Sequence, residues 1–318
     1  MLEVPKVSVI LTVFRRTAFL AEALQSVLDQ TFQDFEVIVT DDSRTDAIRA
    51  ISESFGSERI RYRANAATLG VALNLRSAVA EARGKYVAIL NDDDAWEPEF
   101  LQRLVGPLEE DSERVLAFCD HWIIDGSSVI QKEATEISSR MYGRIDLQPG
   151  VVEHFDQFAV IRNGVPLAMG SVFRIDAFDW ERLVKEVAGA YDYWITCLLA
   201  ASGKLAYYVP MRLTRYRMHG AMETTRLAPD KNNNLVFINE SLLRGNMFPG
   251  LRRDLTRRYA LALFLVGNDR LRFNQKRQAR DYLGRSLRLA FDKKAFAWFC
   301  LSYLPAPLIS LLVGHRAR

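Results

Sequence analysis

The chain is poor in cysteine. Its three cysteines, Cys119, Cys197 and Cys300, lie far apart and form no CxxC pair. Such spacing excludes the common cysteine-based zinc motifs and a dense disulfide framework. It is typical of a protein from a reducing compartment, so we expect a cytoplasmic location.

Long apolar segments are also lacking. The N-terminal run from Val7 to Phe14 spans eight residues and follows no cationic leader, so it predicts a first strand rather than a signal peptide. A membrane-spanning helix needs about 20 apolar residues. The nearest approach, residues 295–314, is interrupted by Pro305 and Pro307, and we expect no transmembrane helix.

Charge is distributed unevenly along the chain, although the net charge is only +3. From Arg244 to the end, 16 Lys and Arg stand against 4 Asp and Glu, a balance of +12, while the preceding part carries −9. This asymmetry predicts a basic tail that meets an anionic partner. Two interpretations stay open: the tail contacts a membrane surface peripherally, or it packs on the rest of the protein. No nucleic-acid-binding motif accompanies the charge, so we expect no nucleic-acid partner.

The first 120 residues alternate between short β-branched runs and segments with helical periodicity. Strands are expected near residues 6–14, 35–40, 59–63, 85–90 and 114–119, with the charged third one at an edge of the sheet. This alternation predicts an α/β fold with a mostly parallel sheet. Arg-rich amphipathic segments follow near the end, so we expect an α/β domain over residues 1–228 and a basic helical extension over 229–318.

Polar residues end several of the predicted strands. Thr12 lies near the end of the first, Asp41 and Asp42 end the second, and the segment "NDDD" (91–94) ends the fourth. Ligands of open α/β sheets bind at the carboxyl ends of the strands, and carboxylates are the ligands that Mg²⁺ and Mn²⁺ prefer. Either acidic cluster alone could be a turn before a helix. Two clusters at the ends of two strands favour a nucleotide and metal site.

These segments together resemble a known family. "VSVILTVF", "VTDDSRTD", Gly70 and "ARGKYVAILNDDDAWEPEFL" are similar to the opening strand, the "DDGS(T)D" turn and the "ARGEYIxFLDxDDxxxPxxL" pattern of family 2 glycosyltransferases. The resemblance is close over residues 5–120 and loose over 165–220. It implies the GT-A fold, a Rossmann-like, mostly parallel sheet flanked by helices, here with a C-terminal α-helical extension.

The resemblance also implies a reaction. Family members of this kind are inverting hexosyltransferases that use a nucleoside diphosphate sugar, commonly UDP-linked, with Mg²⁺ or Mn²⁺. The acceptor would be a saccharide or a lipid-linked saccharide in bacterial polysaccharide or cell-envelope biosynthesis. By the same analogy the protein would lie in the cytoplasm, peripherally on the inner face of the plasma membrane.

Individual roles carry over by position. The residues implied in donor-nucleotide binding are Thr12, Phe14, Asp41, Asp42, Gly70 and Asp92. Those implied at the DXD-motif metal are Asp93, its neighbour Asp94, and His219 in "YRMHGAMET". The general base would be Asp192, in the first turn of a helix predicted from Tyr191. Residues that could contact the sugar or the acceptor are Trp96, Gly170 and Ser171.

Several of these residues have a structural alternative. Asp192 could be an acid placed for the helix dipole, Trp96 a core residue, and His219 a surface-loop residue. Arg217 could offset phosphate charge or solvate a strand.

The sequence also departs from the family pattern. Asn91 stands where the family often has Asp, so one charge is lost and weaker metal binding is expected. Arg44 stands where serine is usual, and "LNLR" replaces "ARN" after Gly70.

Two other functions stay open. A nucleotidyltransferase would be expected to carry a Gly-rich loop after the first strand, and "LTVFRRTAF" has no glycine. A catalytically inactive nucleotide-sugar-binding or scaffold protein, acting through its helical tail, is the other.

Overall fold

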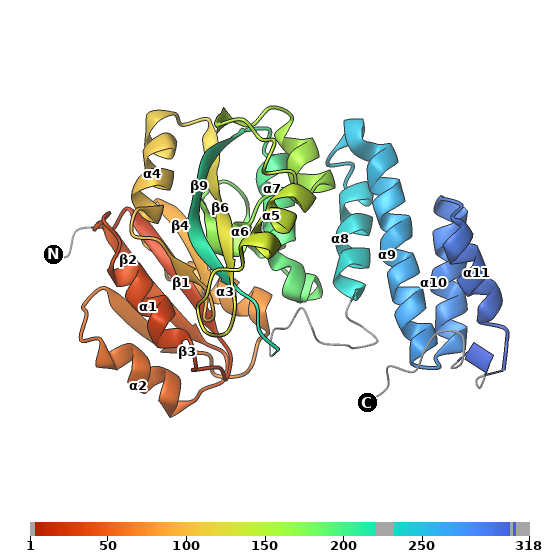
Figure 1. Cartoon of the computed structure of the whole chain (residues 1–318), viewed down its shortest axis with the longest axis horizontal. Helices are drawn as coiled ribbons and strands as arrows, with labels where there is room; N and C mark the ends of the chain where they lie inside the picture. The colour runs from red at the N-terminus through yellow and green to blue at the C-terminus, as the bar shows by residue number, and fades with distance from the viewer. Residues whose placement is uncertain (1–3, 221–231, 306–307, 310–318) are drawn as a thin grey trace. The chain divides into compact units, whose positions relative to one another are not determined.

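The computed structural model describes residues 4–220, 232–305 and 308–309. The chain divides into two compact units, Met1–Gly220 and Ala221–Arg318, and each is described by itself. The predicted domain boundary at residue 228 lies outside the described residues. The first unit carries the α/β architecture and the second is helical (Figure 1).

A nine-stranded sheet forms the centre of the first unit, in the order β3-β2-β1-β4-β8-β6-β9-β5, with β7 paired to β9. The pairings of β1 with β2 and β4, of β2 with β3, and of β6 with β9 are parallel, and the shorter pairings of β5, β7 and β8 are antiparallel. The strands are β1 Val7–Val13, β2 Phe35–Asp41, β3 Ile60–Ala64, β4 Tyr86–Asn91, β5 Ala95–Trp96, β6 Arg114–Ile124, β7 Gly150–Val151, β8 Ser171–Arg174 and β9 Leu205–Arg217.

The predicted α/β fold with a mostly parallel sheet is confirmed, and β3 lies at an edge as expected. The expected strands do not include β9, a strand of 13 residues that pairs along most of β6; a strand was considered only at its end, around Arg217. Its pattern is neither continuously apolar nor cleanly alternating, because arginines stand at positions 212, 215 and 217. Helical periodicity was absent there as well, so the segment gave little local signal.

Seven α-helices are described in the first unit: α1 Leu20–Leu28, α2 Asp46–Ser54, α3 Val71–Val79, α4 Phe100–Glu110, α5 Lys132–Met141, α6 Leu167–Gly170 and α7 Tyr191–Ala201. Figure 1 shows α1 and α2 across the same face of the sheet. They and α4 share one core with alternate strand residues such as Val9, Leu11 and Val39. The opposite face of β2 meets α3, where Thr40 Oγ1 donates to Asn74 Oδ1 at 2.6 Å. Burial on both faces explains why these strands read as continuous apolar runs.

The carboxyl ends of the central strands lie at one edge of the sheet. Thr12 of β1 pairs with Thr40 of β2 and with Asn91 of β4, and Val13 pairs with Asp41. The polar residues that end these strands therefore share one edge. Any group bound by the loops after β1, β2 and β4 must lie at this edge.

The second unit is built from α8 Asn233–Arg244, α9 Arg252–Arg272, α10 Lys276–Leu289 and α11 Lys293–Leu301. Helices α9 and α10 approach closely at Gly267, where an added Cβ would lie 2.7 Å from Leu283 Cγ. Ser286 Oγ also donates to Ala260 O at 2.7 Å across this contact. Asp292 begins α11 by accepting from Ala295 N at 2.8 Å. None of the described helices is long and apolar enough to cross a membrane.

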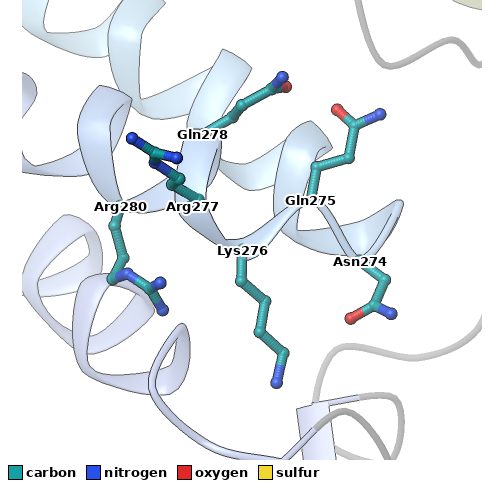
Figure 2. Close-up of a pocket in the computed structure, with 6 residues that line it drawn as sticks. All are labelled: Asn274, Gln275, Lys276, Arg277, Gln278 and Arg280. Atoms are coloured by element: carbon teal, nitrogen blue, oxygen red, sulfur yellow. The ribbon is translucent and has the colours of Figure 1, made fainter.

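An open pocket of about 620 Å³ lies at the start of α10. Figure 2 shows Lys276 and Arg280 directed to one side of it and Gln278 to the other. Lys276 Nζ donates to Leu304 O at 2.7 Å and Arg280 Nη1 to Ser302 O at 3.0 Å. Both cations thus satisfy carbonyl groups just beyond the end of α11, a common use of basic side chains at helix C-termini.

Candidate active site

The acidic segment Asp92–Asp94 forms a tight turn between β4 and β5, and its three side chains are nearly inaccessible, with 4%, 7% and 1% of each residue exposed. Burial raises the pKa of Asp92 to about 6 and also raises the pKa of Asp94. Adjacent buried carboxylates repel one another and lose hydration. The turn is therefore stable only if protons or positive groups reach it.

Arg16, in the loop after β1, supplies a positive group. Its Nε donates to Asp92 Oδ1 at 3.0 Å, and its Nη2 forms an ion pair with the same oxygen. Its Nη1 lies 2.8 Å from Asp93 Oδ2 and 3.3 Å from His219 Nε2. His219 Nε2 is in turn 3.1 Å from Asp93 Oδ2. The predicted metal residues Asp93 and His219 thus converge, with a guanidinium beside both.

The structure gives Asn91 a reason for departing from the family pattern. Asn91 Nδ2 donates to Asp94 Oδ2 at 3.1 Å, and Asn91 Oδ1 accepts from Tyr191 OH at 3.1 Å. An aspartate at this position could not donate to Asp94 and would add a fourth negative charge. Asp94 Oδ1 accepts from the backbone N of Arg217 at 2.9 Å, so both of its oxygens are held within the protein.

Arg217 of β9 supports the turn from its other side. Its side chain is fully buried, and its Nε donates to Asp93 O at 2.8 Å. Nη1 donates to Ser128 Oγ at 2.7 Å, and Nη2 lies 2.7 Å from Glu22 Oε2. The guanidinium also lies over the ring of Phe19, 4.3 Å from its centroid. Because its Nε bonds to the turn and its two Nη atoms contact Ser128 and Glu22, Arg217 holds the acidic turn in place.

The start of α7 joins Asn91, the residue before the acidic turn, and Asp192 lies in the first turn of this helix. Tyr191 bonds to Asn91, and burial together with the charges of Asp192, Asp94, Asp93 and Asp92 raises its pKa. Asp192 Oδ1 accepts from Tyr193 N at 2.7 Å, as expected of an acid in a first helical turn. Burial raises the pKa of Asp192. A carboxylate with a raised proton affinity is suited to accept a proton.

Asp41 and Asp42 use their oxygens inside the protein. Asp41 Oδ1 accepts from the backbone N and Oγ of Ser43 at 2.7 and 2.6 Å, and its Oδ2 accepts from Tyr62 OH at 2.9 Å. This is the turn that the simpler interpretation predicted. Asp42 Oδ2 accepts from Gly70 N at 2.8 Å, which holds Gly70 at a φ of +81°, a conformation that favours glycine. Both aspartates shape the loops of the predicted nucleotide edge.

The other predicted contacts differ in exposure. Phe14, with 48% of its surface exposed, lies just after β1, where a base could stack on it, and Thr12 is nearly buried at the end of that strand. Trp96 is buried, stacks on Phe100 with ring centroids 4.2 Å apart, and donates from Nε1 to Met169 O at 2.7 Å. Trp96 therefore packs in the core, as the structural alternative for this residue predicted.

Gly170 and Ser171 are also buried, beside Pro166. An added Cβ on Gly170 would lie 2.9 Å from Pro166 Cγ, and Ser171 Oγ donates to Pro166 O at 3.5 Å. These contacts give both residues a packing role.

Two functional features were missed from the sequence. Arg16 and Tyr191 touch the acidic turn or its neighbour Asn91, yet neither was assigned a role. The signal for Arg16 was present, since "FRR" follows the first apolar strand directly at the predicted ligand edge. Tyr191 gave no comparable signal, because its contact depends on how α7 meets β4.

Comparison with known proteins decides the family. The sequence model of Glycosyl transferase family 2 matches residues 8–165, a region that includes β1, β2, β4 and the acidic turn. The chain belongs to glycosyltransferase family 2. The resemblance found in the sequence is thereby confirmed. The matched region ends before Asp192 and His219, so the roles of these two residues stay predictions.

Two relatives of this family 2 member differ in the length of the match and in how specific their names are. An "uncharacterized glycosyltransferase" of Haemophilus influenzae is 27% identical over 224 residues, which is 68% of this chain and 66% of that protein. A GalNAc(5)-diNAcBac-PP-undecaprenol beta-1,3-glucosyltransferase of Campylobacter jejuni is 30% identical over 132 residues, 41% of this chain and 42% of that enzyme. The chain thus spans less than two thirds of these relatives.

Solved structures of low sequence identity show the same fold. TarS from S. aureus, determined with UDP-GlcNAc, superposes with a TM-score of 0.63 at 15% identity, over 98% of this chain and 89% of that one. The mannosyltransferase PcManGT of Pyrobaculum calidifontis, determined with GDP-Man and Mn²⁺, gives 0.59 at 18% identity, over 98% and 84%. The predicted GT-A fold is confirmed.

The role of Arg217 as a support can be tested by stability. Replacing Arg217 with Met should lower the free energy of unfolding by about 3–5 kcal/mol, because it leaves Glu22 and the acidic turn without their buried partner. Urea denaturation measures this. The matched control is Arg215→Met on the same strand, which breaks a partly exposed pair with Glu97 and should cost less than about 1 kcal/mol. Equal losses in the two variants would remove the special role of Arg217.

Proposed function

We propose that the protein is an inverting glycosyltransferase that moves a sugar from a nucleoside diphosphate sugar, UDP-linked, to a hydroxyl group of a saccharide or lipid-linked saccharide. One observation carries the proposal: Asp92, Asp93 and His219 meet at the carboxyl edge of β4, and the helix that begins with Tyr191 and Asp192 bonds to the same turn through Asn91. That edge is where open α/β sheets bind nucleotides.

The donor would lie along the ends of β1, β2 and β4. Thr12 and Phe14 would face the base, Asp42 and Gly70 would shape the loop beside it, and Asp92 would lie on the ribose and diphosphate side. Two proteins of this fold were determined with a nucleotide sugar, TarS with UDP-GlcNAc and PcManGT with GDP-Man. These complexes support a nucleotide-sugar donor, and the UDP form is the proposal for this chain.

The residues present suit a divalent cation. Asp93 Oδ2 and His219 Nε2 converge and already face a positive group. The described residues contain no cluster of three or more His, Cys, Asp or Glu arranged as a metal site. Mg²⁺, however, is usually held by one or two protein carboxylates plus substrate phosphates. Asp93 and His219 would hold Mg²⁺ or Mn²⁺, with Asp94 in support, and the ion would stabilise the charge of the leaving diphosphate.

Asp192 would act as the general base. In the proposed reaction the acceptor oxygen forms a bond to the anomeric carbon while the bond from that carbon to the diphosphate breaks. The electron pair of that bond leaves with the nucleoside diphosphate, and the acceptor proton goes to the Asp192 carboxylate. Attack opposite to the leaving group inverts the anomeric centre, and the sugar passes through an oxocarbenium-like state. The raised pKa of Asp192 favours this proton transfer.

The second unit suits a peripheral membrane contact, which would place the protein on the inner face of the plasma membrane. Phe291, Phe296 and Tyr303 are exposed there, with 72%, 50% and 64% of each residue accessible, and the exposed Lys293 and Lys294 lie between the two phenylalanines in the chain. Exposed aromatic residues among cations are typical of interfacial helices. A lipid-linked acceptor, as in the name of the Campylobacter jejuni relative, would be reached from such a position.

Replacing Asp192 with Asn tests the catalytic proposal. With Mn²⁺ and a panel of sugar nucleotides, the wild-type protein should release a nucleoside diphosphate, and Asp192→Asn should be slower by about 10²–10⁴-fold because it lacks the proton acceptor. Donor affinity by calorimetry should change little. The exposed Asp176→Asn serves as the control. Wild-type rates in Asp192→Asn would reject the base, and no release from any donor would favour the inactive binding or scaffold function.

Liposome flotation tests the membrane proposal. The full chain should float with anionic vesicles, and the exposed double variant Phe291→Ser/Phe296→Ser should float much less, as should a chain lacking residues 293–318. Ile137→Ser, which removes an exposed apolar side chain from α5, should behave as wild type. Equal flotation of all four proteins would mean that the second unit does not attach the protein to membranes.

A further inference from the structure

We propose that Arg16 is an exchangeable internal cation: it neutralises Asp92 and Asp93 in the free protein and leaves them when a divalent cation binds. The inference rests on the proposed function, because it takes the divalent cation to be the one that accompanies the donor. It assigns a function to a residue that the family resemblance left without one.

The geometry makes the two cations mutually exclusive. Arg16 Nη1 lies 2.8 Å from Asp93 Oδ2 and 3.3 Å from His219 Nε2, so it faces both atoms that would ligate a metal. A guanidinium only donates hydrogen bonds, and at Asp93 Oδ2 it occupies an acceptor lone pair that a metal ion needs. A metal ligated by Asp93 and His219 would also repel a guanidinium at contact distance. Arg16 must therefore move for the metal to bind.

Arg16 is free to leave, whereas the carboxylates are not. Its side chain is 28% exposed, against 5% and 10% for those of Asp92 and Asp93, and it projects from the loop that follows β1. Arg217 provides the contrast, since its side chain is 0% exposed and also bonds to Glu22 and Ser128. One arginine thus holds the backbone of the turn permanently, and the other compensates its charge only until a ligand does so.

This exchange has an energetic consequence. Asp92 and Asp93 keep their positions without a metal, because Arg16 compensates their charge, so the site is already formed in the free protein. The metal must then displace charge-assisted hydrogen bonds before it binds, which weakens its apparent affinity. The released guanidinium remains tethered beside the proposed diphosphate position, where its charge would offset this loss when the donor arrives.

The experiment measures Mn²⁺ binding in the absence of donor, by calorimetry and by electron paramagnetic resonance. Arg16→Gln should bind Mn²⁺ at least about tenfold more tightly than the control Arg15→Gln, the effect expected from removing a competing set of charge-assisted hydrogen bonds. Arg15 is the neighbouring exposed arginine, and its guanidinium lies over the ring of Phe14. The two variants lose the same charge, and only Arg16→Gln also loses the contact with the carboxylates.

Three further measurements test whether the tighter Mn²⁺ binding comes from the contact of Arg16 with the two carboxylates. Arg16→Gln should unfold at a lower temperature than Arg15→Gln in EDTA, because Asp92 is left buried without a partner, and Mn²⁺ should close the difference. Adding Asp93→Ala to Arg16→Gln should abolish the tighter binding. Arg16→Lys, which keeps a charge but lacks the planar fork of donors that spans the two carboxylates, should fall between wild type and Arg16→Gln.

Arg16→Gln that binds Mn²⁺ no more tightly than Arg15→Gln would overturn the proposal, as would Arg16→Lys that binds more weakly than wild type. The readouts need neither donor nor turnover. A protein that transfers no sugar could still show the exchange, and an active one could lack it, so failure here is distinguishable from failure of the proposed function.

Discussion

Three adjacent carboxylates can be buried only where positive charge and hydrogen-bond donors reach them, and the first unit is organised around this constraint. Arg16 comes from the loop after β1, Arg217 from the end of β9, and Asn91 from β4 itself. Tyr191 then joins the start of α7 to Asn91. Segments far apart in the sequence are thus brought together around one acidic turn, and the start of α7 is joined to its neighbour Asn91.

The sheet and its ligand edge could be predicted, because both depend on local patterns. Continuous apolar strands buried on two faces and polar residues at their ends are visible in the sequence, and the register places Thr12 beside Asn91. The partners of the acidic turn could not be predicted. The chain has 42 Lys and Arg residues, and the path of the folded chain decides which of them reaches a carboxylate. Arg16 contacts Asp93, whereas its neighbour Arg15 lies over the ring of Phe14. Asp41 was assigned to the nucleotide, but its oxygens close the turn before α2.

The partners of each polar group distinguish the residues that fix the turn from those proposed to bind a ligand. Arg217 and Asp94 fix the position of the turn, because their side-chain nitrogen or oxygen atoms are bonded within the protein. Asp93 differs from these groups, because its charge is compensated by the partly exposed Arg16, and it is the group proposed to exchange this partner for a ligand. Asn91 belongs to the first kind, and its amide donates to Asp94 where an aspartate could not.

The central claim is that the acidic turn always carries a cation, Arg16 in the free protein and a divalent metal with the donor. Anomalous diffraction from crystals grown with Mn²⁺ and a nucleotide sugar, compared with crystals grown in EDTA, tests it most directly. The account predicts a manganese peak between Asp93 and His219 with the Arg16 guanidinium turned away, and Arg16 back on the carboxylates in EDTA. A manganese peak elsewhere, or one at Asp93 with Arg16 still in contact with it, would contradict the account.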